Sequence, residues 1–208
     1  MKRIFVVRHG DKLKGDFFSS TAGVQDAPLS VEGKRQARIT AKRLCRNDID
    51  LIYSSDLLRA IQTSEIIQRC IKAPLKIDPA LREINFGIME SKSNEEIEEL
   101  YPSFSQAYYV QETDIRYPGG ESGADVLKRL LPILEQLKSS TSDSIAVITH
   151  GGTIRVLLSH ILGVDLGKRF LLGDPPALCS VSVIHYDGSI DRLCLHSFND
   201  YSHLARAF

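Results

Sequence analysis

Two histidines follow apolar runs whose composition is typical of buried strands. Ile4-Phe5-Val6-Val7 ends at Arg8-His9-Gly10, and residues 144–149 end at His150-Gly151-Gly152. A neutral imidazole can act as a nucleophile, an arginine guanidinium can clamp phosphate oxygens, and glycine lets a ligand approach the backbone. Ligands in open α/β sheets bind at the carboxyl ends of strands, so these side chains are placed for chemistry. The alternative for the first segment is a basic pair in an ordinary strand-to-loop turn.

Arg59 occupies an electrostatically unfavourable position in a predicted helix. Arg59 falls in the first turn of a helix that we expect from about Leu57 to Ile71. The amino end of a helix carries partial positive charge and free N–H groups, so a cation gains nothing there from the helix dipole. Binding an anion would explain the placement, and a plain surface arginine is the alternative.

A glutamate is the third candidate for chemistry. Glu83 lies between Leu81 and Ile84, in a half-apolar, irregular stretch. Partial enclosure of a carboxyl group by apolar neighbours suits it to general acid catalysis. The alternative is an ion pair with a neighbour such as Arg82.

Apolar periodicity indicates that strands and helices alternate along the chain. Ser30 and Ser122 are expected N-caps, the cluster 54–56 is another, and Pro132 is expected to kink its helix or to separate its first turn. Asp187-Gly188 is the turn of an expected hairpin. The predicted elements are strands at 4–7, 51–53, 75–77 and 144–149, helices at 30–46, 57–71 and 153–162, a further helix after Ser122 with an apolar stripe from Val126 to Leu137, and a hairpin formed by 178–186 and 190–196.

Residues 88–121 differ from the rest of the chain in being acidic and rich in aromatic side chains. Ser93 and Glu96 form a plausible capping box for a short helix that Pro102 ends. We interpret the segment as a cap inserted over the strand ends, and call it the cap below. Its aromatic residues could contact an organic substrate or pack the cap onto the core; they are Tyr101, Phe104, Tyr108, Tyr109 and Tyr117.

The charge balance of the 208 residues excludes some classes of partner. Lysine plus arginine and aspartate plus glutamate both number 26, and no apolar run approaches the length of a membrane span. Zero net charge argues against nucleic acid or an anionic membrane as the main partner. Only four apolar residues follow Lys2 and Arg3, too few for a signal peptide, so a cytoplasmic location is expected.

The four cysteines, Cys45, Cys70, Cys179 and Cys194, are scattered and contain no Cys-x-x-Cys pair. This spacing predicts free thiols with buried, apolar roles in a reducing compartment.

Several other polar residues are expected to have solvent or packing roles. Lys12 and Lys14, on a long loop over residues 11–29, are expected to face solvent, as is Arg155. Gly33 lowers helix propensity in a first turn, which suggests that another group approaches it closely. The remaining histidines show no metal-ligand spacing and are assigned structural roles; they are His160, His185, His196 and His203.

Together these segments resemble the histidine phosphatase superfamily, also called phosphoglycerate mutase-like. No acidic cluster for a metal ion and no Walker loop accompanies them. The resemblance covers nearly the whole chain in five ordered blocks: Arg8-His9-Gly10; residues 26–37, with Pro28-Leu29-Ser30; residues 54–63, with Ser54-Ser55-Asp56-Leu57 and Arg59-Ala60; residues 81–87, with Glu83 and Phe86-Gly87; and Thr149-His150-Gly151-Gly152.

The resemblance implies a role for each candidate. His9 attacks phosphorus and becomes phosphohistidine, while Arg8, Arg59 and His150 hold the phosphoryl oxygens. Glu83 protonates the leaving oxygen and then deprotonates the water that hydrolyses the intermediate. No metal or cofactor is implied. The expected substrate-binding residues are Arg8, Gly10, Gly23, Arg59, Glu83, His150 and Gly151.

The resemblance also implies a fold and an activity. We expect one α/β domain over residues 1–208, a three-layer sandwich with a mostly parallel central sheet, helices on both faces, and the cap inserted at about 88–121. The expected activity is metal-independent hydrolysis of small phosphomonoesters, with a small phosphorylated metabolite as partner and a homodimer left open. Pro118-Gly119-Gly120-Glu121-Ser122 and the tail at 198–204 look similar to α-ribazole phosphatases.

This sequence departs from the family pattern where substrate contacts would be expected. Asp11, Lys12 and Gly15 replace residues that often contact phosphate, and Met89 replaces a frequent aromatic residue. A mutase must hold a substrate carrying a phosphate and a carboxylate, which calls for basic cap residues, yet this cap is acidic. We therefore favour a phosphatase over a phosphoglycerate mutase, and either over a non-catalytic phosphate-binding relative.

Overall fold

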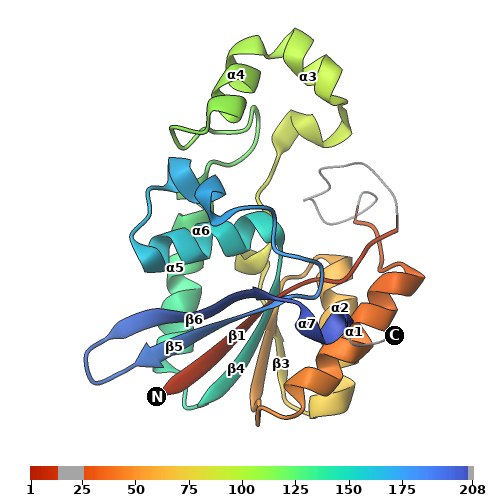
Figure 1. Ribbon diagram of the computed structural model, residues 1–208, viewed down its shortest axis with the longest axis vertical. Helices are drawn as coiled ribbons and strands as arrows, with labels where there is room; N and C mark the ends of the chain where they lie inside the picture. The colour runs from red at the N-terminus through yellow and green to blue at the C-terminus, as the bar shows by residue number, and fades with distance from the viewer. Residues whose placement is uncertain (14–25, 206–208) are drawn as a thin grey trace.

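A six-stranded sheet forms the centre of the computed structural model, which describes residues 1–13 and 26–205 (Figure 1). The strand order is β3-β2-β4-β1-β5-β6. The first four of these strands are parallel, and β5 runs antiparallel to both of its neighbours, which confirms the mostly parallel sheet. The strands are β1 (Lys2–Arg8), β2 (Leu51–Ser54), β3 (Leu75–Ile77), β4 (Ser144–Thr149), β5 (Val181–Asp187) and β6 (Arg192–Asp200).

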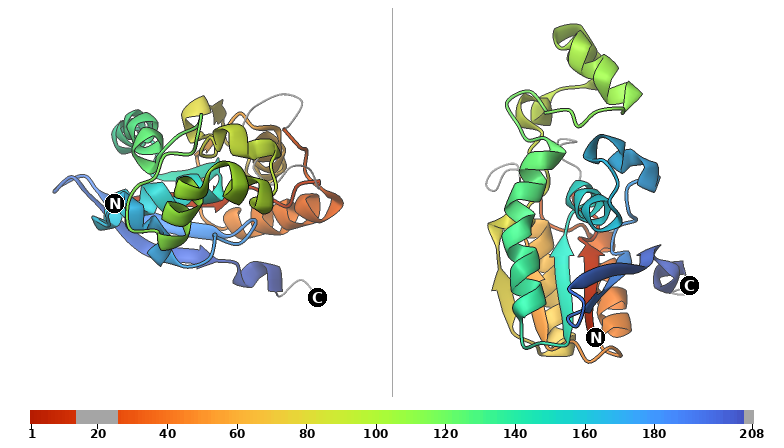
Figure 2. Two further views of the ribbon diagram at one scale, coloured as in Figure 1. Left: turned by 90° about the horizontal axis from the view of Figure 1, so that it is seen from above. Right: turned by 90° about the vertical axis from the view of Figure 1, so that its left-hand side faces the viewer.

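Helices cover both faces of the sheet, as expected (Figure 2). Alternate side chains of β1 point to opposite faces. Ile4 and Val6 therefore pack with α5 (Gly123–Ser139) and α6 (Gly151–Leu162). Phe5 and Val7 pack with α1 (Val31–Leu44) and α2 (Leu58–Ile71) on the other side. The predicted three-layer α/β sandwich is confirmed.

Helix ends follow the predicted capping residues at Ser30 and Ser122 but not at the cluster 54–56. The Ser30 hydroxyl accepts a hydrogen bond from the Gly33 amide, and Ser122 forms a capping box with Asp125. The cluster 54–56 does not cap α2 with a side chain; the Asp26 carboxylate accepts from the first amide of that helix instead. Helix α5 continues through Pro132, so the predicted separation of its first turn is wrong.

The cap stands over the carboxyl ends of the parallel strands (Figure 1). It contains the 3₁₀ helix η2 (Gly87–Ser91) and the helices α3 (Asn94–Leu100) and α4 (Pro102–Val110). The predicted capping box of Ser93 and Glu96 starts α3. Pro102, expected only to end that helix, also occupies the first turn of α4, where its missing N–H costs nothing.

Three short helices complete the described chain: η1 (Pro79–Leu81), η3 (Leu166–Leu172) and α7 (Ser202–Ala205). Of these, η3 packs against α6 and lies below the cap. In the described part of the chain, no helix is both long and apolar enough to cross a membrane.

The cysteines differ from their predicted state. Cys45, at the end of α1, and Cys70, in the last turn of α2, are exposed and joined by a disulfide, with their Cα atoms 6.5 Å apart. Cys194 is exposed and Cys179 is buried, so only Cys179 matches the predicted free, buried thiol. Cys45 and Cys70 lie far apart in sequence, and only the packing of α1 against α2 brings them together.

Candidate active site

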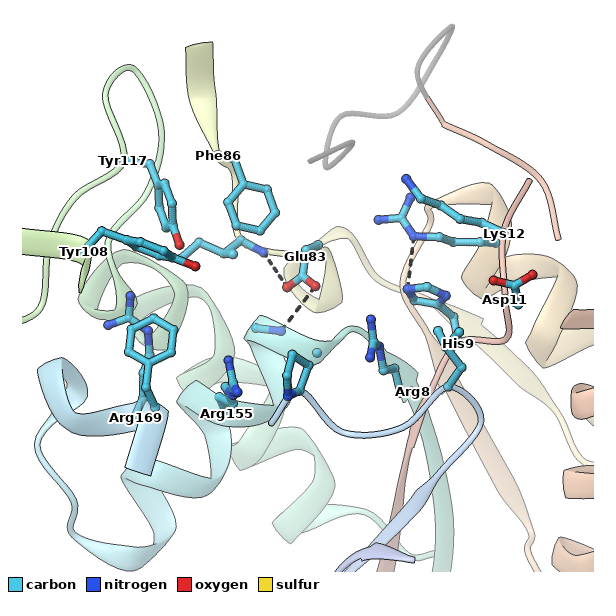
Figure 3. Close-up of a pocket in the computed structure, with 17 residues that line it drawn as sticks. Arg8, His9, Asp11, Lys12, Glu83, Phe86, Tyr108, Tyr117, Arg155 and Arg169 are labelled. Atoms are coloured by element: carbon cyan, nitrogen blue, oxygen red, sulfur yellow. Dashed lines mark hydrogen bonds between the residues drawn. The ribbon is translucent and has the colours of Figure 1, made fainter. Parts of the chain in front are cut away.

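The register of the sheet brings the two predicted histidines together. Arg8 in β1 lies opposite Thr149 in β4, so the next residues, His9 and His150, are neighbours with ring centroids 5.0 Å apart. His9 lies at the floor of a cavity of about 380 Å³ beneath the cap (Figure 3). The cavity is also lined by cationic and aromatic side chains, among them Arg8, Lys12, Arg59, Arg155, Arg169, Phe86, Tyr108, Tyr117 and Phe170.

The contacts of His9 fix which ring nitrogen is available. Its Nδ1 lies 2.7 Å from the carbonyl oxygen of Gly10, which can only accept, so Nδ1 carries the proton. Its Nε2 accepts a hydrogen bond from Nε of Arg59 at 3.3 Å. Burial, followed by the charges of Arg59 and Arg8, holds the pKa of His9 well below its ordinary value. The imidazole is therefore neutral at physiological pH, with a lone pair on Nε2.

The low pKa of His9 makes the stability of the protein depend on pH. Below pH 6.5 the unfolded chain binds a proton at His9 and the folded chain does not, so stability is full above that pH and is lost as the pH falls. We expect the free energy of unfolding of the wild type to fall more steeply between pH 6.5 and 5 than that of H9N, by up to about 1.4 kcal/mol per pH unit. Urea denaturation at several pH values measures this, and parallel curves would contradict it.

His150 and Arg8 each offer a nitrogen atom that has no hydrogen-bond partner among the described residues. The Ser55 hydroxyl lies 2.9 Å from Nε2 of His150 and accepts from the Leu57 amide, so its own proton can point at Nε2. This leaves the proton of His150 on Nδ1, which is buried and unpaired. Nε of Arg8 is likewise buried and unpaired. Because buried donors are normally satisfied, these two nitrogens indicate a binding site for an acceptor such as a phosphoryl oxygen.

Arg59 is one of the most buried cations in the described structure. Its side chain is 3% exposed, and its Nη1 forms an ion pair of 3.2 Å with Asp26, which also caps α2. The negative charge of Asp26 thus offsets the unfavourable position of Arg59 at the amino end of α2. The ion pair also holds the guanidinium group beside His9. The alternative of a plain surface arginine is wrong.

Glu83 is held by the amino end of α6. Its carboxylate accepts hydrogen bonds from the amides of Gly152 at 3.2 Å and Thr153 at 3.1 Å, and from its neighbour Ile84 at 2.9 Å. The free amides at the amino end of α6 are thus occupied by Glu83 itself. Arg82 pairs with Asp56 and not with Glu83, so that alternative is wrong.

Of the two glycines at the start of α6, one makes room for a charged group. A Cβ atom on Gly152 would lie 2.7 Å from a carboxylate oxygen of Glu83, well inside contact distance. A Cβ atom on Gly151 would lie 3.4 Å from Nε of Arg8, which is an ordinary contact. A methyl group on Gly152 would therefore take space that Glu83 occupies, whereas a methyl group on Gly151 would fit.

We expect Gly152→Ala to lower kcat by roughly 10- to 100-fold, because a misplacement of about 1 Å has that effect on a catalytic group. The crowded groups are the side-chain ends of Glu83 and of Ile84, whose Cγ2 would lie 2.9 Å from the new Cβ atom, so these side chains move and the backbone fold remains. Gly151→Ala is the matched control and should change kcat by less than about threefold. Steady-state kinetics and thermal denaturation of both variants test this. Equal kcat values in the two variants would contradict it.

Gly10 and Gly33 serve backbone packing. The Gly10 amide donates to the Thr63 hydroxyl at 3.1 Å, and Gly10 is not among the residues that line the cavity. A Cβ atom on Gly33 would lie 1.9 Å from the carbonyl oxygen of Asp11, which confirms the predicted close approach. Gly23 and Lys14 lie outside the described residues.

Sequence reasoning missed part of the cavity. Lys12 and Arg155, expected to face solvent, both line it. Arg155 is four residues after Gly151 on α6 and so shares its face, a signal that could have been used. Arg169 and Phe170 lie in η3, whose role no sequence pattern indicated.

The aromatic residues of the cap divide between the cavity and the core. Tyr108 and Tyr117 line the cavity, and their hydroxyl groups point into it (Figure 3). Burial raises the pKa of Tyr117, so its hydroxyl keeps its proton and can donate. Tyr101 and Phe104 pack against the core, and Tyr109 is exposed.

Comparison with known proteins defines the class. Residues 4–199 match the histidine phosphatase superfamily (branch 1), and the chain belongs to it. The chain is 31% identical over 188 residues to phosphoserine phosphatase 1 of Hydrogenobacter thermophilus, covering 90% of this chain and 88% of that protein. It is 32% identical to the probable phosphoglycerate mutase GpmB of Yersinia enterocolitica, covering 98% and 95%. The structure of a mycobacterial glucosyl-3-phosphoglycerate phosphatase superposes with a TM-score of 0.82 at 26% identity, covering 95% and 98%.

Proposed function

We propose that this protein is a phosphatase that hydrolyses small phosphomonoesters through a phosphohistidine on His9. The observation that carries the proposal is a buried, neutral imidazole whose unprotonated Nε2 faces a cavity lined by arginines. A neutral imidazole is a competent nucleophile, and guanidinium groups stabilise charge on a transferring phosphoryl group.

In the first step, the N–H at Nε of Arg59 passes from Nε2 of His9 to a phosphoryl oxygen, and Nε2 bonds to phosphorus as the bond to the leaving oxygen breaks. Arg8, Arg59 and Nδ1 of His150 bind the three other phosphoryl oxygens, whose charge they neutralise. Glu83, protonated at this stage, gives its proton to the leaving oxygen, so the alcohol departs neutral.

In the second step, water hydrolyses the phosphohistidine. Glu83, now a carboxylate, takes a proton from the water as its oxygen bonds to phosphorus and the bond between phosphorus and Nε2 breaks. Inorganic phosphate leaves, and His9 is neutral again. No step needs a metal ion, because the arginines supply the positive charge.

A panel of phosphomonoesters tests this proposal through the release of inorganic phosphate. We expect release from several members, unchanged by excess chelator. Loss of activity in chelator that magnesium or zinc restores would overturn the metal-free mechanism. No release from any member, with retained phosphate binding, would instead favour a non-catalytic phosphate-binding relative.

Phosphoglycerate mutase activity is the second candidate, favoured by the similarity to GpmB. The acidic cap argued against it, but Arg155 and Arg169 supply basic groups from the body of the protein. A mutase returns the phosphoryl group to an organic acceptor, whereas a phosphatase gives it to water. An assay for isomerisation of 3-phosphoglycerate beside the phosphate-release assay separates the two.

The remaining expectations belong with this proposal. A small phosphorylated metabolite is the proposed substrate, which fits a cytoplasmic location. We also propose that the chain forms one domain with the cap as an insertion. A homodimer is a further proposal, and nucleic acid is not a proposed partner.

A further inference from the structure

Two arginines outside the proposed phosphoryl site flank one aromatic ring in the cavity. The guanidinium carbons of Arg155 and Arg169 lie 5.2 Å and 4.6 Å from the ring centroid of Phe170. Arg155 comes from α6 and Arg169 from η3, and both side chains rise toward the cavity from below (Figure 3). They form a second cationic region, distinct from Arg8, Arg59 and His150 around His9.

Each of these arginines has a buried nitrogen without a partner. Nη1 of Arg169 is satisfied by Asp114 of the cap and by the carbonyl of Leu166, but its Nη2 is unpaired although the side chain is only 3% exposed. Nη2 of Arg155 donates to the carbonyl of Gly173, and its Nε is buried and unpaired.

The charge of Arg155 also lacks a counterion. No carboxylate of the described residues lies within ion-pair distance of it, whereas Arg169 pairs with Asp114 at 2.7 Å. A half-buried cation with an unpaired donor is costly unless an anion binds there.

The phosphoryl group does not use this region. In the proposed mechanism its oxygens are matched by Arg8, Arg59 and His150, and the cavity of about 380 Å³ extends beyond these residues to Arg155 and Arg169. The rings of Phe86, Tyr108 and Tyr117 line the cavity together with Arg155 and Arg169 and can hold an organic body.

We propose that the leaving group of the substrate carries a second anionic group, a carboxylate or a second phosphate, which Arg155 binds together with the free nitrogen of Arg169. This inference rests on the proposed function for the position of the reacting phosphoryl group. The expected substrates are phosphomonoesters whose alcohol portion carries an anionic group and an apolar or aromatic group.

Non-hydrolysable phosphonates test the inference without requiring turnover. Benzylphosphonate, para-carboxybenzylphosphonate and para-xylylenediphosphonate share one body and differ in the second group, which is absent, a carboxylate or a phosphonate. We expect one or both of the compounds with a second anionic group to bind the wild-type protein roughly tenfold or more tightly than benzylphosphonate in calorimetric titrations, as a hydrogen bond to a charged group would give. The tighter of the two identifies the second group.

Arg155→Met should abolish this preference, and Arg155→Lys should keep part of it because the charge remains. The Gly173 carbonyl released by these variants is on an exposed residue and can bind water, so the fold should persist. Arg116→Met removes a positive charge from the exposed cap surface and is the matched control; its preference should equal that of the wild type.

Two results would overturn the inference: equal binding of all three phosphonates to the wild type, or a preference that survives in R155M. Binding of inorganic phosphate should change less than about twofold in R155M, since Arg155 is not at the phosphoryl site. Failure of the proposed function gives a different result. If the preference for a second anionic group is observed but no ester releases phosphate, the protein is not a hydrolase, and the second anion site is still supported.

Discussion

Replacement of His9 by alanine is expected to lower kcat/KM on the order of 10⁴- to 10⁶-fold, the loss seen when an essential nucleophile is removed. The cause is the absence of Nε2, without which no covalent intermediate can form. The remaining arginines can still bind the substrate, so KM should change much less than kcat. Steady-state phosphate release with the best ester of the panel measures both.

The control for this variant is its fold. His9 lies at the end of β1, beside a cavity, so its loss removes no packed core contact of the kind made by Val6 and Val7. Thermal denaturation should show a folded protein, and inorganic phosphate should still bind. A folded H9A protein that retained more than a few per cent of wild-type activity would show that another residue is the nucleophile.

Replacement of Glu83 by glutamine is expected to affect esters according to their leaving groups. An alkyl phosphate leaves as a strongly basic alkoxide and needs a proton, whereas a nitrophenyl phosphate leaves as a stabilised phenolate. General acid catalysis contributes typically 10²–10⁴-fold, so the alkyl ester should lose about that factor and the aryl ester much less. Glutamine keeps the shape of the side chain and the hydrogen bonds to one of its oxygens.

The comparison is sound only in the first chemical step, since hydrolysis of phosphohistidine also uses Glu83. Rapid-quench measurement of alcohol release in the first turnover isolates that step. Equal losses for the two esters would show that Glu83 only supports the site. The acid would then be sought at Asp11, whose carboxylate lines the cavity and accepts from the Ser30 hydroxyl.

The fold was predictable because its signals are local and periodic. Four parallel strands were visible as short apolar runs, and two of the helices between them, α1 and α5, as stripes with serine N-caps. The predictions from Pro132 and from the cluster 54–56 were wrong because tertiary contacts determine both helices. Helix α5 continues through Pro132 because its apolar face is packed along its length. Helix α2 is capped by Asp26, which is distant in sequence.

The candidate site was predictable where a side chain follows a strand or departs from a local pattern. His9 and His150 were found because they follow strands whose ends meet at one edge of the sheet. Arg59 was found because a cation gains nothing at the amino end of a helix, and Glu83 because apolar residues stand beside it. Arg169 could not be found, because a 3₁₀ helix has no periodicity that places it beside Phe170 and below the cap. The pairing of Cys45 with Cys70 was missed because the packing of α1 against α2 brings these residues together, and their spacing in the sequence does not reveal that packing.

The most direct test of the account is identification of the phosphorylated residue. The wild-type protein is mixed with a reactive aryl phosphate, quenched in base within the first turnover, and examined by mass spectrometry of the intact chain and its peptides. We expect one phosphoryl group, labile in acid, on the peptide that contains His9, and none in H9A. A phosphoryl group on another residue, or full activity with no covalent intermediate on any residue, would contradict the account.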